Sequence, residues 1–105
     1  MFNKYAQFTT QPGIILVRDR FNNLVWAMES DNCRKRIEDK DKEHIRALGN
    51  GGLYPESWNG GRPEAAFAAG HLVYDVIPMP GSTRAERSAV RDGLEKYSLA
   101  KTSAV

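Results

Sequence analysis

The chain has 105 residues, of which 41% are hydrophobic and 27% charged, and its formal net charge is +2. This length fits one domain with a modest core, and the composition argues against a disordered chain or a strongly basic nucleic-acid binder. The only cysteine, Cys33, excludes an internal disulfide and fits a reducing compartment. No apolar run could cross a bilayer and residues 1–10 lack a signal-peptide core, so we expect a cytoplasmic protein without a membrane partner.

Two apolar runs near the N-terminus predict a β-hairpin. After a lead-in that we expect to be irregular, Gly13 to Arg18 reads GIILVR and Leu24 to Met28 reads LVWAM. Both runs have the length and the β-branched content of buried strands. The polar stretch DRFNN between them is typical of a turn.

A charged helix is predicted from residue 33 to residue 49. Polar residues at positions 30–32 offer N-caps, and Gly49 is a residue type that commonly follows a helix end. Most positions in between carry charges of both signs, so one side of this helix should be solvated. The apolar stripe is narrow, and its members are Cys33, Ile37, His44, Ile45 and Leu48.

Residues 49–71 are rich in glycine and proline and predict a long loop, with one or two helical turns at 64–69. Tyr54 and Trp58 lie in this loop, where there is little core to fill. We therefore expect both rings to be exposed and to form a contact surface for a base or a partner protein. The sequence leaves open whether the loop is ordered.

A third strand and a last helix complete the predicted order. His71 to Pro78 reads HLVYDVIP, and Thr83 with Glu86 has the spacing of a helix capping box. The expected apolar face of the last helix consists of Ala89, Val90, Leu94 and Tyr97. The order strand, strand, helix, loop, strand, helix predicts an α+β fold. It would be one domain over residues 1–105, with a three-stranded antiparallel or mixed sheet flanked by helices.

Two segments of the predicted order carry a further pattern. Residues 12–15 read PGII at the start of the first strand, and residues 25–37 read VWAMESDNCRKRI from the second strand into the first helix. This pattern resembles the GIY-YIG nuclease domain, in which a G-I-Y strand is followed by a V-Y-I-G strand, an Asn and an Arg-bearing helix. The resemblance covers about residues 12–97 and implies the family's small sheet flanked by helices.

The resemblance also implies a site for metal-assisted phosphodiester hydrolysis. The family uses a tyrosine near the attacking water, an arginine on the phosphate, and a glutamate that binds a divalent metal. In this chain the two tyrosine positions hold Ile15 and Trp26, the motif glycine is Met28, and the metal position is Arg91. The helix arginine remains as Arg36. The losses fall on proton transfer and metal binding, which favours a nucleic-acid-binding pseudoenzyme.

In that first interpretation the basic run Arg34, Lys35 and Arg36 meets phosphate. The loop carrying Tyr54 and Trp58 would then cover the bound strand. No cofactor is needed for this function. Trp26 has two interpretations, a ring for base stacking or a core residue.

Two alternatives remain open. The first is an active endonuclease dependent on Mg²⁺ or Mn²⁺, with the metal on Glu86 or Asp92, although the capping box accounts for Glu86 without a metal. Its replacement tyrosines would be Tyr5, Tyr54 or Tyr74. The second is a protein-binding inhibitor or adaptor, of the kind a phage or mobile element could encode, which contacts a host or partner protein through the Trp58 loop. The oligomeric state is left open.

Overall fold

The structure is a computed structural model that describes residues 3–103. Its centre is a three-stranded sheet in the order β2-β1-β3, with both strand pairs antiparallel. The strands are β1 (Gly13–Arg18), β2 (Leu24–Ser30) and β3 (Val73–Pro78). This confirms the α+β class and shows that the sheet is antiparallel.

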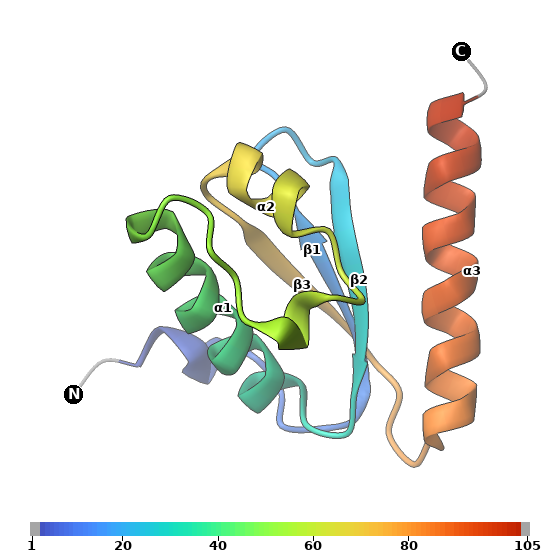
Figure 1. Cartoon of the computed structure of the whole chain (residues 1–105). Coiled ribbons are helices and arrows are strands. Elements are labelled where there is room, and N and C mark those ends of the chain that lie inside the picture. The colour runs from blue at the N-terminus through green and yellow to red at the C-terminus, as the bar shows by residue number, and fades with distance from the viewer. Residues whose placement is uncertain (1–2, 104–105) are drawn as a thin grey trace.

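Helices cover both faces of this sheet (Figure 1). One face carries α1 (Cys33–Gly49) and α2 (Pro63–Ala69), and the other carries α3 (Arg84–Ser103). Two short 3-10 helices, η1 (Lys4–Gln7) and η2 (Glu56–Trp58), lie on the same side of the sheet as α1 (Figure 1). None of the described helices is long and apolar enough to cross a bilayer.

The central strand β1 is buried on both faces, which explains its unbroken apolar sequence. Ile14 and Leu16 belong to the core under α3, whereas Ile15 and Val17 belong to the core under α1 and α2. Gly13 opens the strand because a Cβ at this position would lie 2.4 Å from the Ile77 carbonyl oxygen. The backbone of β3 therefore occupies the space that a side chain would need.

Helix α1 begins where the sequence predicts. The Asn32 side chain accepts a hydrogen bond from the Lys35 N–H at 3.2 Å, as an N-cap does. The predicted apolar stripe is only partly correct. Ile45 and Leu48 are 51% and 39% exposed, and the helix buries Lys40 and Asp41 beside the expected apolar residues.

The N-terminal segment explains why Asp41 is buried. We expected an irregular lead-in, but Asn3 caps η1 and Tyr5 is buried against α1. The Tyr5 hydroxyl donates to Asp41 at 2.8 Å, and the Tyr74 hydroxyl donates to the same carboxylate at 2.9 Å. Lys4 Nζ lies 2.9 Å from it. A carboxylate that satisfies three donors joins η1, α1 and β3.

Because of Asp41, the free energy of unfolding of the protein should fall at acid pH. Burial acts to raise the pKa of Asp41, but the hydrogen bonds from Lys4, Tyr5 and Tyr74 outweigh it and hold the pKa below its ordinary value of 3.8. A lowered native pKa stabilises the fold above the unfolded value, and this contribution is lost as the pH falls through the native pKa. We expect urea denaturation to show a free energy of unfolding that falls below about pH 4.

The matched pair Asp41→Asn and Asp39→Asn tests this origin. Asp39 is an exposed carboxylate on the same helix. The Asp41 variant should lose stability at neutral pH and show a flatter acid limb, whereas the Asp39 variant should keep the wild-type profile. An unchanged acid limb in the Asp41 variant would assign the acid sensitivity to other groups.

The segment 49–71 is more structured than a long loop. Helical turns do follow Pro63, as predicted, and η2 adds another turn. The prediction of an exposed Trp58 is wrong, because this side chain is 1% exposed and lies in the main core. Its ring centroid lies 5.0 Å from that of Trp26 and 4.5 Å from that of Tyr54. The segment folds back over α1 and inserts the indole between that helix and β2.

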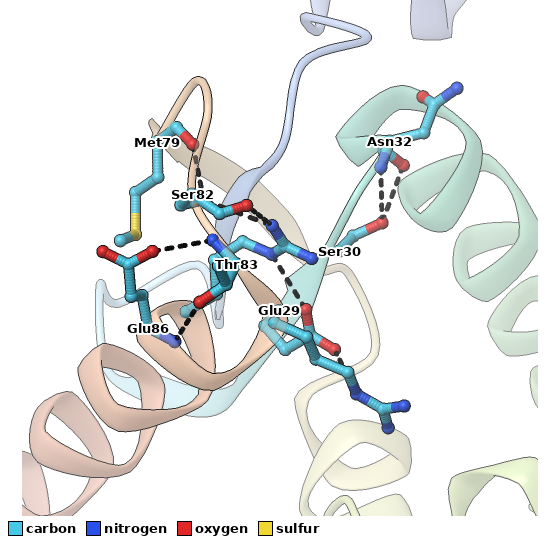
Figure 2. Close-up of polar contacts among 9 residues, drawn as sticks. Glu29, Ser30, Asn32, Met79, Ser82, Thr83 and Glu86 are labelled. Atoms are coloured by element: carbon cyan, nitrogen blue, oxygen red, sulfur yellow. Dashed lines mark hydrogen bonds and ion pairs between the residues drawn. The ribbon is translucent and has the colours of Figure 1, made fainter.

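Helix α3 begins with the predicted capping box (Figure 2). The Thr83 N–H donates to Glu86 Oε1 at 2.9 Å, and the Glu86 N–H donates to Thr83 Oγ1 at 3.2 Å. The predicted apolar face is wrong for three of its four members. Tyr97 is 68% exposed and Val90 39% exposed, and Ala89 is also exposed, while Leu94 packs on the core under α3.

Candidate functional site

A groove of about 380 Å³ runs along the outer edge of β2. This strand is at the edge of the sheet, and α1 and α3 lie on opposite sides of it (Figure 1). Four consecutive β2 residues, 26–29, line the groove. The other lining residues come from α1, from the 57–60 segment and from α3, and they are Arg36, Lys40, Ser57, Gly60, Arg84, Arg91, Asp92 and Glu95.

Among the residues that the structure describes, Arg36 is the cation of this groove whose side chain has no partner. It lies in the first half of α1 and is exposed. Within residues 3–103, its guanidinium has no hydrogen-bond or ion-pair partner. Five N–H donors in a planar fork are therefore available to an anion, a geometry that matches phosphate oxygens.

Lys40 is a cation of a different kind, because it is 4% exposed and its partners are in the protein. Its Nζ donates to the carbonyl and the hydroxyl of Ser57, both at 3.2 Å, and lies 3.6 Å from Glu43. It also lies 5.6 Å from the Trp26 ring centroid and 5.5 Å from that of Trp58. Burial lowers the pKa of Lys40, against the opposing effect of Glu43. Lys40 holds η2 on α1 and adds positive charge beneath the groove.

The carboxylates of the groove are all engaged with the protein. Glu29 lies 3.0 Å from Arg87 and 3.5 Å from Arg84. Asp92 lies 3.0 Å from Arg91. Glu95 accepts a hydrogen bond from the Ala27 N–H of the edge strand at 3.2 Å. Of the described groups on the groove surface, these contacts leave the guanidinium of Arg36 as the unsatisfied charge.

The structure brings together several positions singled out by the GIY-YIG resemblance. Trp26, Met28, Arg36 and Arg91 all line this one groove, although Arg91 comes from the last helix. Ile15 does not line it, because this side chain is fully buried in the core beneath. The candidate replacement tyrosines lie elsewhere, and they are Tyr5, Tyr54 and Tyr74.

A divalent metal does not fit the carboxylates of this groove. Glu86 is tied to the Thr83 N–H (Figure 2). It is outside the groove lining. Asp92 is paired with Arg91, whose positive charge stands where the resemblance would place a metal ligand. Across the part of the chain that the structure describes, no three His, Cys, Asp or Glu side chains converge to hold a metal ion. We therefore derive no chemical step through a metal.

The basic run 34–36 does not act as one surface. We expected Arg34 to share the solvated side of Arg36, and this is wrong. The Arg34 guanidinium donates to the Phe8 carbonyl at 2.8 Å and to the Ala6 carbonyl at 3.2 Å, so it fastens the N-terminal segment. Lys35 remains exposed and lies 3.8 Å from Asp39, next to the groove rather than in it.

Trp26 is packed and offers little surface for a base. A Cβ at Gly61 would lie 2.7 Å from its Cε2, so the 60–61 backbone rests directly on the indole. Trp58 and Lys40 contact the same ring. These contacts agree with the core interpretation of Trp26. They also explain Gly61, because any side chain there would collide with the ring.

Sequence reasoning missed the ion pair between Glu29 and Arg87, which holds α3 against β2. Both side chains are buried, at 9% and 6% exposed, and Arg87 Nη1 also donates to the Ser82 carbonyl at 2.7 Å. The signal in the sequence was weak, because the partners are 58 residues apart. A charged residue one turn into a capped helix usually faces solvent.

No family model matches this chain, and no significant match was found among curated proteins or solved structures.

Proposed function

We propose that this protein binds nucleic acid through the β2 groove and does not cleave it, as a degenerate relative of the GIY-YIG nuclease domain. The observation that carries the proposal is Arg36, an exposed arginine without a partner among the described residues, at the wall of a groove about 380 Å³ in volume. Arginine in this setting is suited to a phosphate group. A row of arginine side chains suits the phosphate backbone of a nucleic acid, which carries a regular series of negative charges.

The neighbours of Arg36 support a phosphate contact. Arg84 has a side chain that is 85% exposed, and its only ion-pair partner among the described residues is Glu29, at 3.5 Å. Arg91 pairs with the adjacent and exposed Asp92, an arrangement that water and salt weaken easily. Three arginines from two helices can thus turn toward a strand laid along the edge of β2.

The absence of cleavage rests on what stands in the groove. A hydrolytic site needs a group that takes a proton from water, and an indole at position 26 cannot do so. The carboxylates are tied to arginines or to a backbone N–H. The arrangement can bind and orient a phosphodiester but supplies no base for its hydrolysis.

The two alternatives receive less support. An endonuclease would need one of the other tyrosines, but Tyr5 and Tyr74 donate to Asp41, and Tyr54 is hydrogen-bonded to His44. A protein-binding module would need the exposed loop surface that we assigned to Trp58. That indole is buried, and the exposed large apolar side chains of the segment are Leu53, at 77%, and Phe67, at 41%.

Salt-dependent binding tests the proposal. We expect a fluorescein-labelled oligonucleotide to bind with an affinity that falls steeply between about 50 and about 200 mM salt. Arg36→Ala should weaken binding and lower the slope of log K against log salt by about one, because one phosphate contact is lost. Fluorescence anisotropy with single-stranded and duplex DNA measures both quantities.

Arg46→Ala is the matched control, since it removes the same charge from the same helix at an exposed position outside the groove. It should leave the slope unchanged. If the two substitutions weakened binding equally, the effect would come from net charge and not from the groove. An affinity that does not change with salt concentration would reject the proposal. Cleavage of plasmid with Mg²⁺ or Mn²⁺, lost in Arg36→Ala, would support the endonuclease instead.

A further inference from the structure

A second and larger cavity lies away from the groove. It has a volume of about 590 Å³, is open to solvent on one side, and is lined by η1, α1, the turn at 70–72 and the start of β3. None of its lining residues lines the groove of β2. Its volume is within the range of sites that hold small organic molecules.

The polar corner of this cavity is the carboxylate of Asp41. Oδ2 accepts from the Tyr5 hydroxyl at 2.8 Å, and Oδ1 accepts from the Tyr74 hydroxyl at 2.9 Å. Burial, followed by the charge of Asp41, raises the pKa of Tyr74, so its hydroxyl stays protonated and donates. These two phenols belong to packed elements and hold the carboxylate ionised and oriented.

The third partner of Asp41 is held less firmly. Lys4 Nζ lies 2.9 Å from Oδ2, but the Lys4 side chain is 52% exposed whereas that of Asp41 is 12% exposed. The same ammonium lies 5.2 Å from the centroid of the Tyr5 ring. A carboxylate with an adjacent aromatic face is a recognised setting for an organic cation. The lysine thus marks the place where a ligand's ammonium can sit.

The walls beside this corner are apolar. Ile45 is 51% exposed, Leu48 is 39% exposed and Val73 is 40% exposed. Phe8 and the buried Leu72 complete this surface. Covering exposed aliphatic side chains removes apolar area from water, which favours a ligand with a hydrophobic body. The same cavity therefore offers an anionic corner, at Asp41, and an apolar wall to one small molecule.

Two of the other polar side chains that line the cavity, His44 and Gln7, are already engaged with the protein. His44 has both ring nitrogens engaged, with the Tyr54 hydroxyl at 2.7 Å from Nδ1 and the Gly70 carbonyl at 2.6 Å from Nε2. Gln7 donates from its amide to the Lys4 carbonyl. Asp41 is the one carboxylate in the lining.

We propose that this cavity binds a small organic ammonium ion, whose charged nitrogen replaces Lys4 at Asp41 and whose apolar body covers Ile45 and Leu48. Lys4 then acts as an internal competitor that occupies the cation position when no ligand is present. This site is independent of the nucleic-acid groove. The plain alternative is that Lys4 and Asp41 only fasten η1 to α1, in which case no ammonium binds.

Titration with 2-phenylethylammonium distinguishes these two interpretations. Two-dimensional amide NMR of the 105-residue chain should show saturable shifts at Asp41, Ile45, Leu48 and Val73. The uncharged analogue 2-phenylethanol should bind at least about tenfold more weakly, because it forms no charge-assisted contact with Asp41. Equal binding of the two compounds would overturn the proposal.

Two substitutions give opposite expected signs. Lys4→Ala removes the competitor and should tighten binding of 2-phenylethylammonium by about tenfold, whereas Asp41→Asn should abolish it. Lys35→Ala removes an exposed lysine of α1 that pairs with Asp39 and lies outside the cavity lining, and it should change nothing. If Asp41→Asn fails to fold, the Lys4 variant and the uncharged analogue still decide the question. No saturable shift in the wild type and the Lys4 variant at millimolar ligand would overturn the proposal.

Discussion

Replacing Arg87 by alanine should destabilise the protein by about 3 kcal/mol or more, because it leaves the charge of Glu29 buried with a weak partner. The side chain of Arg87 is 6% exposed, and its Nε donates to Glu29 Oε2 at 3.0 Å. It also donates to the carbonyl and the hydroxyl of Ser82. One side chain thus joins the first turn of α3 to the end of β2 and to the turn before α3. Urea denaturation followed by tryptophan fluorescence measures the loss.

Arg84→Ala is the control for this prediction. Arg84 approaches the same carboxylate at 3.5 Å, but its side chain is 85% exposed. Its removal should cost less than about 0.5 kcal/mol, as is usual for exposed residues. A double variant, Glu29→Gln with Arg87→Met, removes both charges and should recover part of the loss. If the two single arginine variants were equally destabilised, burial of the pair would not be the cause.

Replacing Trp58 by alanine should cost about 3 to 5 kcal/mol, as the loss of a large core side chain does. Trp58 is 1% exposed, and it packs against Trp26, Tyr54 and His44. Its indole N–H donates to Glu43. The cavity left behind would lie where α1, η2 and β2 meet. Far-UV circular dichroism during urea denaturation suits this variant, because the change removes one of the two tryptophans.

Trp58→Phe keeps most of the ring but removes the donor to Glu43, so it should cost about 1 to 2 kcal/mol. Leu53→Ala is the matched change on the exposed surface of the same segment, where the side chain is 77% exposed, and it should be nearly neutral. A Trp58→Ala protein as stable as the wild type would contradict the burial of this side chain. The expected destabilisation also affects how binding data are interpreted. If Trp58→Ala failed to bind a partner, the cause would be unfolding rather than the loss of a direct contact.

Stability and the proposed binding groove are separable in this fold. The groups that hold the groove together are the buried Lys40 and Arg87 and the Glu29 side chain, which is 9% exposed. The groups proposed to contact phosphate are Arg36, Arg84 and Arg91, which make few contacts. Substitutions of the second set should therefore change binding without changing stability. For this reason the difference between Arg36→Ala and Arg46→Ala can be assigned to binding.

Features that depend on neighbouring residues could be predicted from the sequence. The hairpin follows from two apolar runs and a polar turn, the start of α1 follows from Asn32, and the start of α3 follows from Thr83 and Glu86. Each of these involves contacts within a few residues, so the pattern of side chains is sufficient. Arg36 was singled out by the resemblance at the corner between β2 and α1, and its role in binding stays a prediction.

Only the tertiary structure decided which polar groups are buried and which apolar groups are not. Asp41 is buried because Tyr5 and Tyr74 reach it from 36 and 33 residues away, and Glu29 because Arg87 reaches it from 58 residues away. No local pattern encodes such partners, and a charge without one would face water. The same holds for Trp58. Its glycine-rich surroundings in the sequence predict an exposed side chain, but the segment folds back over α1 and buries it. The sequence by itself determined the hairpin and the starts of α1 and α3, and the packing of distant segments determined which side chains form the groove and the cavity.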